Sequence, residues 1–76
     1  MLQAFRSSGD LLADRRYGYA RVAYEERDYG AAADLARQAL ELAPDFAAAH
    51  ALLGRAALAA GHPDEAAAAL ERALAL

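Results

Sequence analysis

Small and large apolar residues recur along this chain at an offset of 34 residues. When residues 13–42 are placed on residues 47–76, the apolar residues that coincide are Ala13 with Ala47, Ala23 with Ala57, Ala32-Ala33 with Ala66-Ala67, Ala39-Leu40 with Ala73-Leu74 and Leu42 with Leu76. The same offset places Arg21 on Arg55. A fixed period of this length is typical of stacked helical repeats, in which each unit buries its apolar face on its neighbour.

Capping residues and helix breakers predict where the helices begin and end. We expect four helices, over residues 11–26, 29–42, 46–60 and 63–76. The expected N-caps are Asp10 (or Ser8), Asp28 and Asp45, because a short polar side chain can accept from the free N–H groups of a first turn. Pro44 ends the second helix, and Gly61 ends the third as a left-handed residue.

Loops of two to four residues force adjacent helices to lie antiparallel. The predicted fold is therefore all-α, with two antiparallel helical hairpins, residues 11–45 and 46–76, stacked as a short superhelix. Residues 1–10 are expected to form an N-terminal segment that is partly disordered. The spacing of four further residues predicts that they pack in the core: Tyr19, Tyr29, Leu35 and Leu40.

Composition supports the helical prediction and narrows the function. The chain has 24 alanines, one valine and no isoleucine or threonine, a bias that strongly favours helix. With no cysteine it has neither a disulfide framework nor a cysteine metal site. The net charge of −3 is spread without a basic stripe, which argues against a nucleic-acid partner. The sequence shows no membrane span or signal-peptide core, so we expect a cytoplasmic protein with no membrane partner.

Two sets of residues resemble the tetratricopeptide repeat. The second unit carries Leu53-Gly54, Gly61, Ala66, Leu70 and Ala73-Leu74, and the first carries Tyr19-Ala20, Tyr24, Asp28-Tyr29, Ala32, Ala39-Leu40 and Pro44. The resemblance implies that Ala20 and Gly54 let the first helix of each hairpin approach the second closely. Arg27 departs from the pattern, because the family places a turn glycine there, and Ala36 stands where a large residue is preferred.

The resemblance also implies a binding surface, because the first helices of such hairpins line the concave face. The residues expected to contact a partner are Tyr17, Arg21, Tyr24, Arg55 and Leu58. Two guanidiniums beside tyrosines predict a protein or peptide partner with an acidic segment or C-terminal carboxylate. The alternative is that both arginines are solvated and paired with Asp14 or Glu25.

Three classes of function remain to be weighed. The leading prediction is a non-catalytic protein–protein interaction module with no cofactor or metal, since the chain lacks cysteine and its two serines are adjacent. The second is self-association, as a homodimer formed by the apolar C-terminal helix. The third is an accessory domain, because the opening Ser7-Ser8-Gly9-Asp10 with Tyr19-Ala20 resembles bacterial proteins that join tetratricopeptide repeats to a methyltransferase. The catalytic domain would then lie beyond Leu76.

Overall fold

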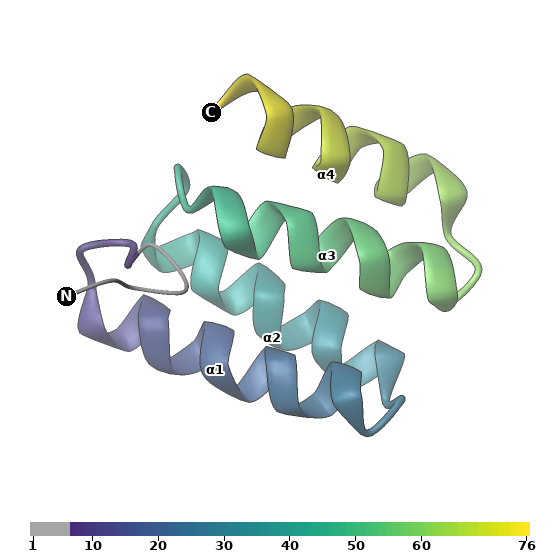
Figure 1. Ribbon diagram of the computed structural model, residues 1–76, viewed down its shortest axis with the longest axis horizontal. Coiled ribbons are helices and arrows are strands. Elements are labelled where there is room, and N and C mark those ends of the chain that lie inside the picture. The colour runs from purple at the N-terminus through teal and green to yellow at the C-terminus, as the bar shows by residue number, and fades with distance from the viewer. Residues whose placement is uncertain (1–6) are drawn as a thin grey trace, which may run out of the picture.

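The computed structural model describes residues 7–76, and in this range the chain is all-α with no strand. Its helices are α1 (Leu11–Glu25), α2 (Tyr29–Leu42), α3 (Ala47–Ala59) and α4 (Pro63–Ala75). Consecutive helices pack against each other, and α1 also contacts α3 (Figure 1). The predicted pair of stacked antiparallel hairpins is confirmed. The predicted disorder before residue 7 lies outside the described residues.

Side-chain caps define the starts of the first two helices. The Asp10 carboxylate accepts from the backbone N–H groups of Leu12 and Ala13, and Asp28 accepts from Ala31. Both predicted caps are confirmed. The predicted cap at Asp45 is wrong, because α3 begins one residue later and its N-cap, Phe46, makes no side-chain cap bond. Asp45 instead accepts from the Arg72 guanidinium of α4 at 3.2 Å.

The two turns inside the hairpins adopt the same left-handed backbone with different residues. Gly61 follows α3, the first helix of the second hairpin, and ends it with a φ of +88°, as predicted. Its repeat equivalent, Arg27, is held at φ +64°. A left-handed conformation brings the Cβ of a non-glycine residue too close to the following carbonyl, at a cost of roughly 1–2 kcal/mol. The first turn is therefore strained by its arginine.

Replacing Arg27 with Gly should raise the free energy of unfolding by about 1 kcal/mol, because glycine adopts this φ without the steric cost. Thermal unfolding followed by circular dichroism should show a higher midpoint. The reciprocal change Gly61→Arg is the matched control and should lower stability by a similar amount. If Arg27→Gly were destabilising, the arginine side chain would be making a contact worth more than the strain.

The core between the helices is built largely from alanine. Its members include Ala20, Ala32, Ala36 and Ala49, each fully buried, and the largest fully buried side chain is Leu52. Leu35 and Leu40 are half-buried against this cluster. The prediction that Tyr19 packs in the core is wrong, since its side chain is 53% exposed. Alanine seams let the helix axes approach closely, so most of the stabilisation comes from many small contacts.

One ion-pair network joins the two hairpins on the side of α2 and α4. The Arg37 guanidinium of α2 donates to both carboxylate oxygens of Glu65 in α4, at 2.7 and 2.9 Å, and to Asp34 at 2.6 Å. The hydrogen bonds from Arg37 hold the pKa of Glu65 below its usual value. All three side chains are more than a third exposed, so screening by solvent keeps the contribution of this network small.

Candidate protein-binding site

The predicted binding residues of the first helices come from α1 and α3, which lie next to each other in the stack (Figure 1). We call Arg21, Tyr24, Arg55 and Leu58 the A-helix face. Arg21 and Tyr24 are three residues apart on α1 and so share one side of the helix. Arg55 and Leu58 have the same spacing on α3, at the repeat-equivalent positions. Arg21, Arg55 and Leu58 are exposed, and Tyr24 is half-buried.

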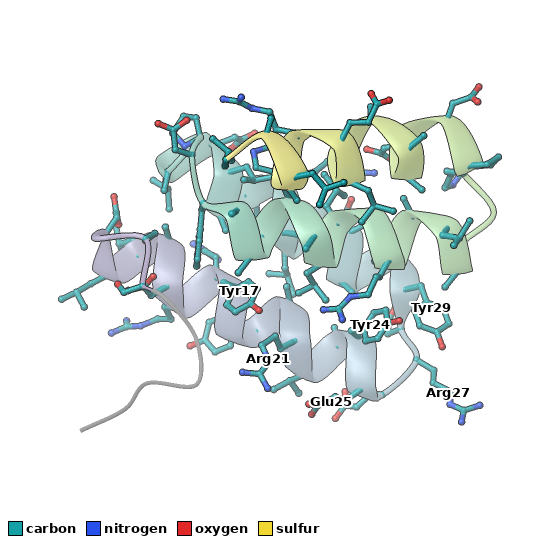
Figure 2. The ribbon with its side chains drawn as sticks, turned by 45° about the horizontal axis from the view of Figure 1, so that its top comes forward. Tyr17, Arg21, Tyr24, Glu25, Arg27 and Tyr29 are labelled. Carbon is teal, nitrogen blue, oxygen red and sulfur yellow. The ribbon has the colours of Figure 1, made fainter. Side chains whose placement is uncertain are left out.

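Tyr24 is the centre of an aromatic and cationic cluster. The guanidinium carbon of Arg55 lies over its ring, 5.6 Å from the ring centroid. The ring of Tyr29, at the start of α2, meets Tyr24 edge-on with 5.4 Å between centroids (Figure 2). A cation–π contact of this kind uses the face of the ring and none of the N–H donors of the guanidinium. The cluster therefore orients Arg55 without using its hydrogen bonds.

The carboxylates nearest in sequence do not neutralise the two arginines. Within residues 7–76, neither Arg21 nor Arg55 forms an ion pair with an acidic side chain. Figure 2 shows Arg21 and Glu25 extending away from the helix stack into solvent. The pairing of these arginines with Asp14 or Glu25, which the sequence left open, is therefore not formed in this part of the chain.

Asp14 is instead engaged by the segment that precedes α1. Its carboxylate accepts from the Ser7 hydroxyl at 2.5 Å, and from the Ser8 backbone N–H at 2.9 Å and hydroxyl at 2.8 Å. These hydrogen bonds hold the pKa of Asp14 below its usual value, and the one from the Ser7 hydroxyl has the largest effect. Asp14 fixes the entry to α1 and leaves the arginines of the A-helix face unneutralised.

Tyr17 has a different environment from the rest of the predicted set. It is only 7% exposed, and its ring packs on that of Phe46 with 5.0 Å between centroids and planes tilted by 52°. In Figure 2 the side chain lies between α1 and α3. Its aromatic surface is therefore used inside the protein, and Tyr17 supports the surface from below.

The structure contains a hollow of about 820 Å³, but it does not lie on the A-helix face. It is found where the start of α1, the α2–α3 turn and the end of the chain meet. Of the predicted binding residues only Tyr17 borders it. The lining residues are Ser7, Ser8, Gly9, Asp10, Tyr17, Leu42, Ala43, Pro44, Asp45, Phe46, Ala47, Ala48 and Leu76.

Tyr29 belongs to the cluster around Tyr24, but its spacing in the sequence did not assign it to the surface. It was predicted as core, but it is half-buried with its ring against Tyr24. This contact depends on the path of the α1–α2 turn, which spacing along one helix does not report. Among residues 7–76, no group of three or more His, Asp or Glu side chains is placed to hold a metal ion, and no helix is long and apolar enough to cross a membrane.

Comparison with known proteins identifies the repeat. A family model described as tetratricopeptide repeat matches residues 11–76, which include all four helices described above. Neither the curated proteins nor the solved structures gave a match. The match concerns the repeat alone, so the methyltransferase context stays a prediction. The matched residues include both hairpins with their close-packed seams and make up more than half of the chain. The chain therefore belongs to the tetratricopeptide repeat family.

Proposed function

We propose that this chain is a non-catalytic protein–protein interaction module whose A-helix face binds an acidic peptide segment. Tetratricopeptide repeats in general act as modules of this kind. The more specific proposal, that the partner is acidic and binds along α1 and α3, depends on the chemistry of the face itself.

The observation that carries the proposal is the state of Arg55. Its guanidinium lies over the Tyr24 ring, the residue is exposed to solvent, and it has no carboxylate partner among residues 7–76. A flexible arginine loses rotamer freedom when it binds, and that loss weakens the interaction. Because the Tyr24 ring already restricts Arg55, less freedom remains to be lost when a carboxylate arrives. Arg55 is thus arranged to accept an anionic ligand in a bidentate pair.

Neighbouring residues extend the contact along the face. Arg21 precedes Tyr24 by three residues and supplies a second cation on the same side of α1. Leu58, 60% exposed, supplies apolar surface on α3 next to Arg55. A peptide with one or two carboxylates and an apolar side chain would satisfy both features. Tyr17 belongs to the support of the face, because Phe46 covers its ring.

A direct test uses a fluorescein-labelled peptide that contains four glutamates and a leucine and ends in a free carboxylate. Arg55→Ala should weaken its binding about tenfold, since a hydrogen-bonded charged pair typically contributes 1.5–3 kcal/mol. Arg55→Lys should also weaken binding, because lysine offers a point charge in place of the planar fork. Fluorescence anisotropy at two salt concentrations would measure both effects, with weaker binding at the higher concentration.

The matched control is Arg15→Ala, an exposed arginine of α1 that lies off the A-helix face. It removes the same charge and should leave affinity for the peptide nearly unchanged. None of these variants should shift the thermal midpoint appreciably, because exposed positions seldom contribute more than about 0.5 kcal/mol. Equal loss of affinity in Arg15→Ala and Arg55→Ala would show that only net charge matters and would refute a defined site.

A further inference from the structure

We infer that copies of this chain associate head to tail, with the outer surface of α4 in one copy packing on the outer surface of α1 in the next. This goes beyond the proposed function and uses different residues. The α1 end face is defined by Leu12, Tyr19 and Val22, and the α4 end face by Ala67, Leu70 and Leu74.

The α1 end face is an apolar stripe left open to solvent. Its three side chains are each more than half exposed. They stand at positions i, i+7 and i+10 of one helix and so occupy the same side. Figure 1 shows α1 at one edge of the stack and α4 at the other. Large apolar side chains gathered on one helix side are unusual on a surface that stays in water.

The α4 end face has the same character at the other end of the stack. Leu74 is 88% exposed, and Leu70 and Ala67 are also exposed. They stand at i, i+3 and i+7, again on one side of the helix. The adjoining side of α4 buries Ala66 and Ala69 against the rest of the protein, and Leu70 lies where the two sides meet, with its side chain next to Gly54 of α3. Two sides of α4 are therefore apolar, but only one of them packs on another helix within residues 7–76.

The internal repeat indicates which surfaces fit together. At the offset of 34, the α1 end face corresponds to Phe46, Leu53 and Ala56 of α3, and all three are buried. The α4 end face corresponds to Ala33, Ala36 and Leu40 of α2, which are buried or half-buried. In the chain α2 and α3 pack on each other. The α1 end face therefore repeats the α3 side of the internal α2–α3 seam, and the α4 end face repeats its α2 side.

Each end face also has one charged residue in it or at its margin. Arg15 lies in the stripe of the α1 end face, three residues after Leu12. Glu71 lies beside Leu70 and three residues before Leu74, on the margin of the α4 end face. Neither charge sets the pairing, because the repeat equivalents of Arg15 and Glu71 in the internal seam are Ala49 and Arg37, which form no ion pair with each other.

An association between unlike faces leaves one of each face free, so it does not stop at a dimer unless the assembly closes into a ring. Sedimentation equilibrium should show a weight-average mass that rises from 8.0 kDa with concentration and passes the dimer value. Leu74→Lys should block the α4 end face, and Tyr19→Lys should block the α1 end face. Each variant alone should remain monomeric, with association at least tenfold weaker than that of the unaltered chain.

The decisive measurement mixes the two variants. Leu74→Lys keeps a free α1 end face and Tyr19→Lys keeps a free α4 end face, so an equimolar mixture should form a complex of twice 8.0 kDa that grows no further. Leu12→Lys should reproduce the behaviour of Tyr19→Lys, and Leu58→Lys, on the A-helix face, should associate like the unaltered chain. Circular dichroism verifies that each variant is folded. A monomeric unaltered chain at about 1 mM, self-association of Tyr19→Lys alone, or a mixture that stays monomeric would each overturn the inference.

Discussion

Replacing Leu52 with Ala is expected to lower the free energy of unfolding by about 3 kcal/mol, one of the two largest effects of a single change in this protein. Leu52 is 1% exposed and is the largest side chain that the fold buries completely. Truncation removes its transfer free energy and leaves a cavity. Most of the buried core is alanine, whose side chain has no rotamers with which to fill that space.

The loss is large compared with the total. A domain of 76 residues has a stability of roughly 4–11 kcal/mol at the usual 0.05–0.15 kcal/mol per residue. A change of about 3 kcal/mol should lower the thermal midpoint by roughly 12–24 °C for a domain of this size. Urea unfolding followed at 222 nm would measure it, with a lower midpoint and an unchanged m-value.

Leu58→Ala is the matched control for Leu52→Ala. It makes the same substitution in the same helix at a side chain that is 60% exposed. Its effect should stay within about 0.5 kcal/mol. Comparable losses at the two positions would mean that helix propensity, and not the buried core, determines the response.

Local rules predicted most of the architecture, and their failures have identifiable causes. Asp10, Asp28 and Gly61 act within one helical turn, so their positions could be read from the sequence alone. Asp45 has a residue type suited to an N-cap, but an ion pair with Arg72, 27 residues away, takes its carboxylate. When a carboxylate can either cap a helix or pair with a residue far along the chain, the neighbouring residues alone do not show which of the two it does.

Tyr19 shows the other kind of failure. Its repeat equivalent, Leu53, is buried because the preceding hairpin covers that side of α3, and α1 has no such neighbour within residues 7–76. The apolar pattern is therefore the same at both positions, whereas burial differs with place in the stack. The pattern predicts which side of a helix is suited to packing, and only the arrangement of helices shows whether another helix is there.

The sequence predicted the exposed positions of the A-helix face but not the contacts between them. Repeat equivalence placed Arg21 and Arg55 at matching positions, and these two are exposed as expected. The cation–π contact of Arg55 with Tyr24 and the contact of Tyr17 with Phe46 depend on distances between helices. Those distances follow from the alanine and glycine seams, which a one-dimensional pattern identifies without giving their spacing.

A close approach of α3 and α4 accounts for the second large effect, at Gly54. A Cβ at this position would stand 2.6 Å from the Leu70 Cγ and 3.3 Å from the Ala66 carbonyl oxygen of α4. In the first hairpin the equivalent pair is Ala20 and Ala36, so the larger residue on α4 is matched by the smaller one on α3. Gly54→Val should therefore force α3 and α4 apart and lower the free energy of unfolding by about 3 kcal/mol, the upper range for overpacking.

Two comparisons separate a clash in the seam from other effects of valine. Gly18→Val makes the same change in α1, where an added Cβ meets nothing within 4 Å, and should be neutral or slightly stabilising because valine has a better helix propensity than glycine. In a Leu70→Ala background, the cost of Gly54→Val should fall by more than half, because the side chain nearest the new Cβ is gone. The double-mutant cycle would then give a coupling of at least about 1.5 kcal/mol between the two positions. Additive effects would show that Leu70 turns outward freely and that the close approach at Gly54 is set by the backbone of α4.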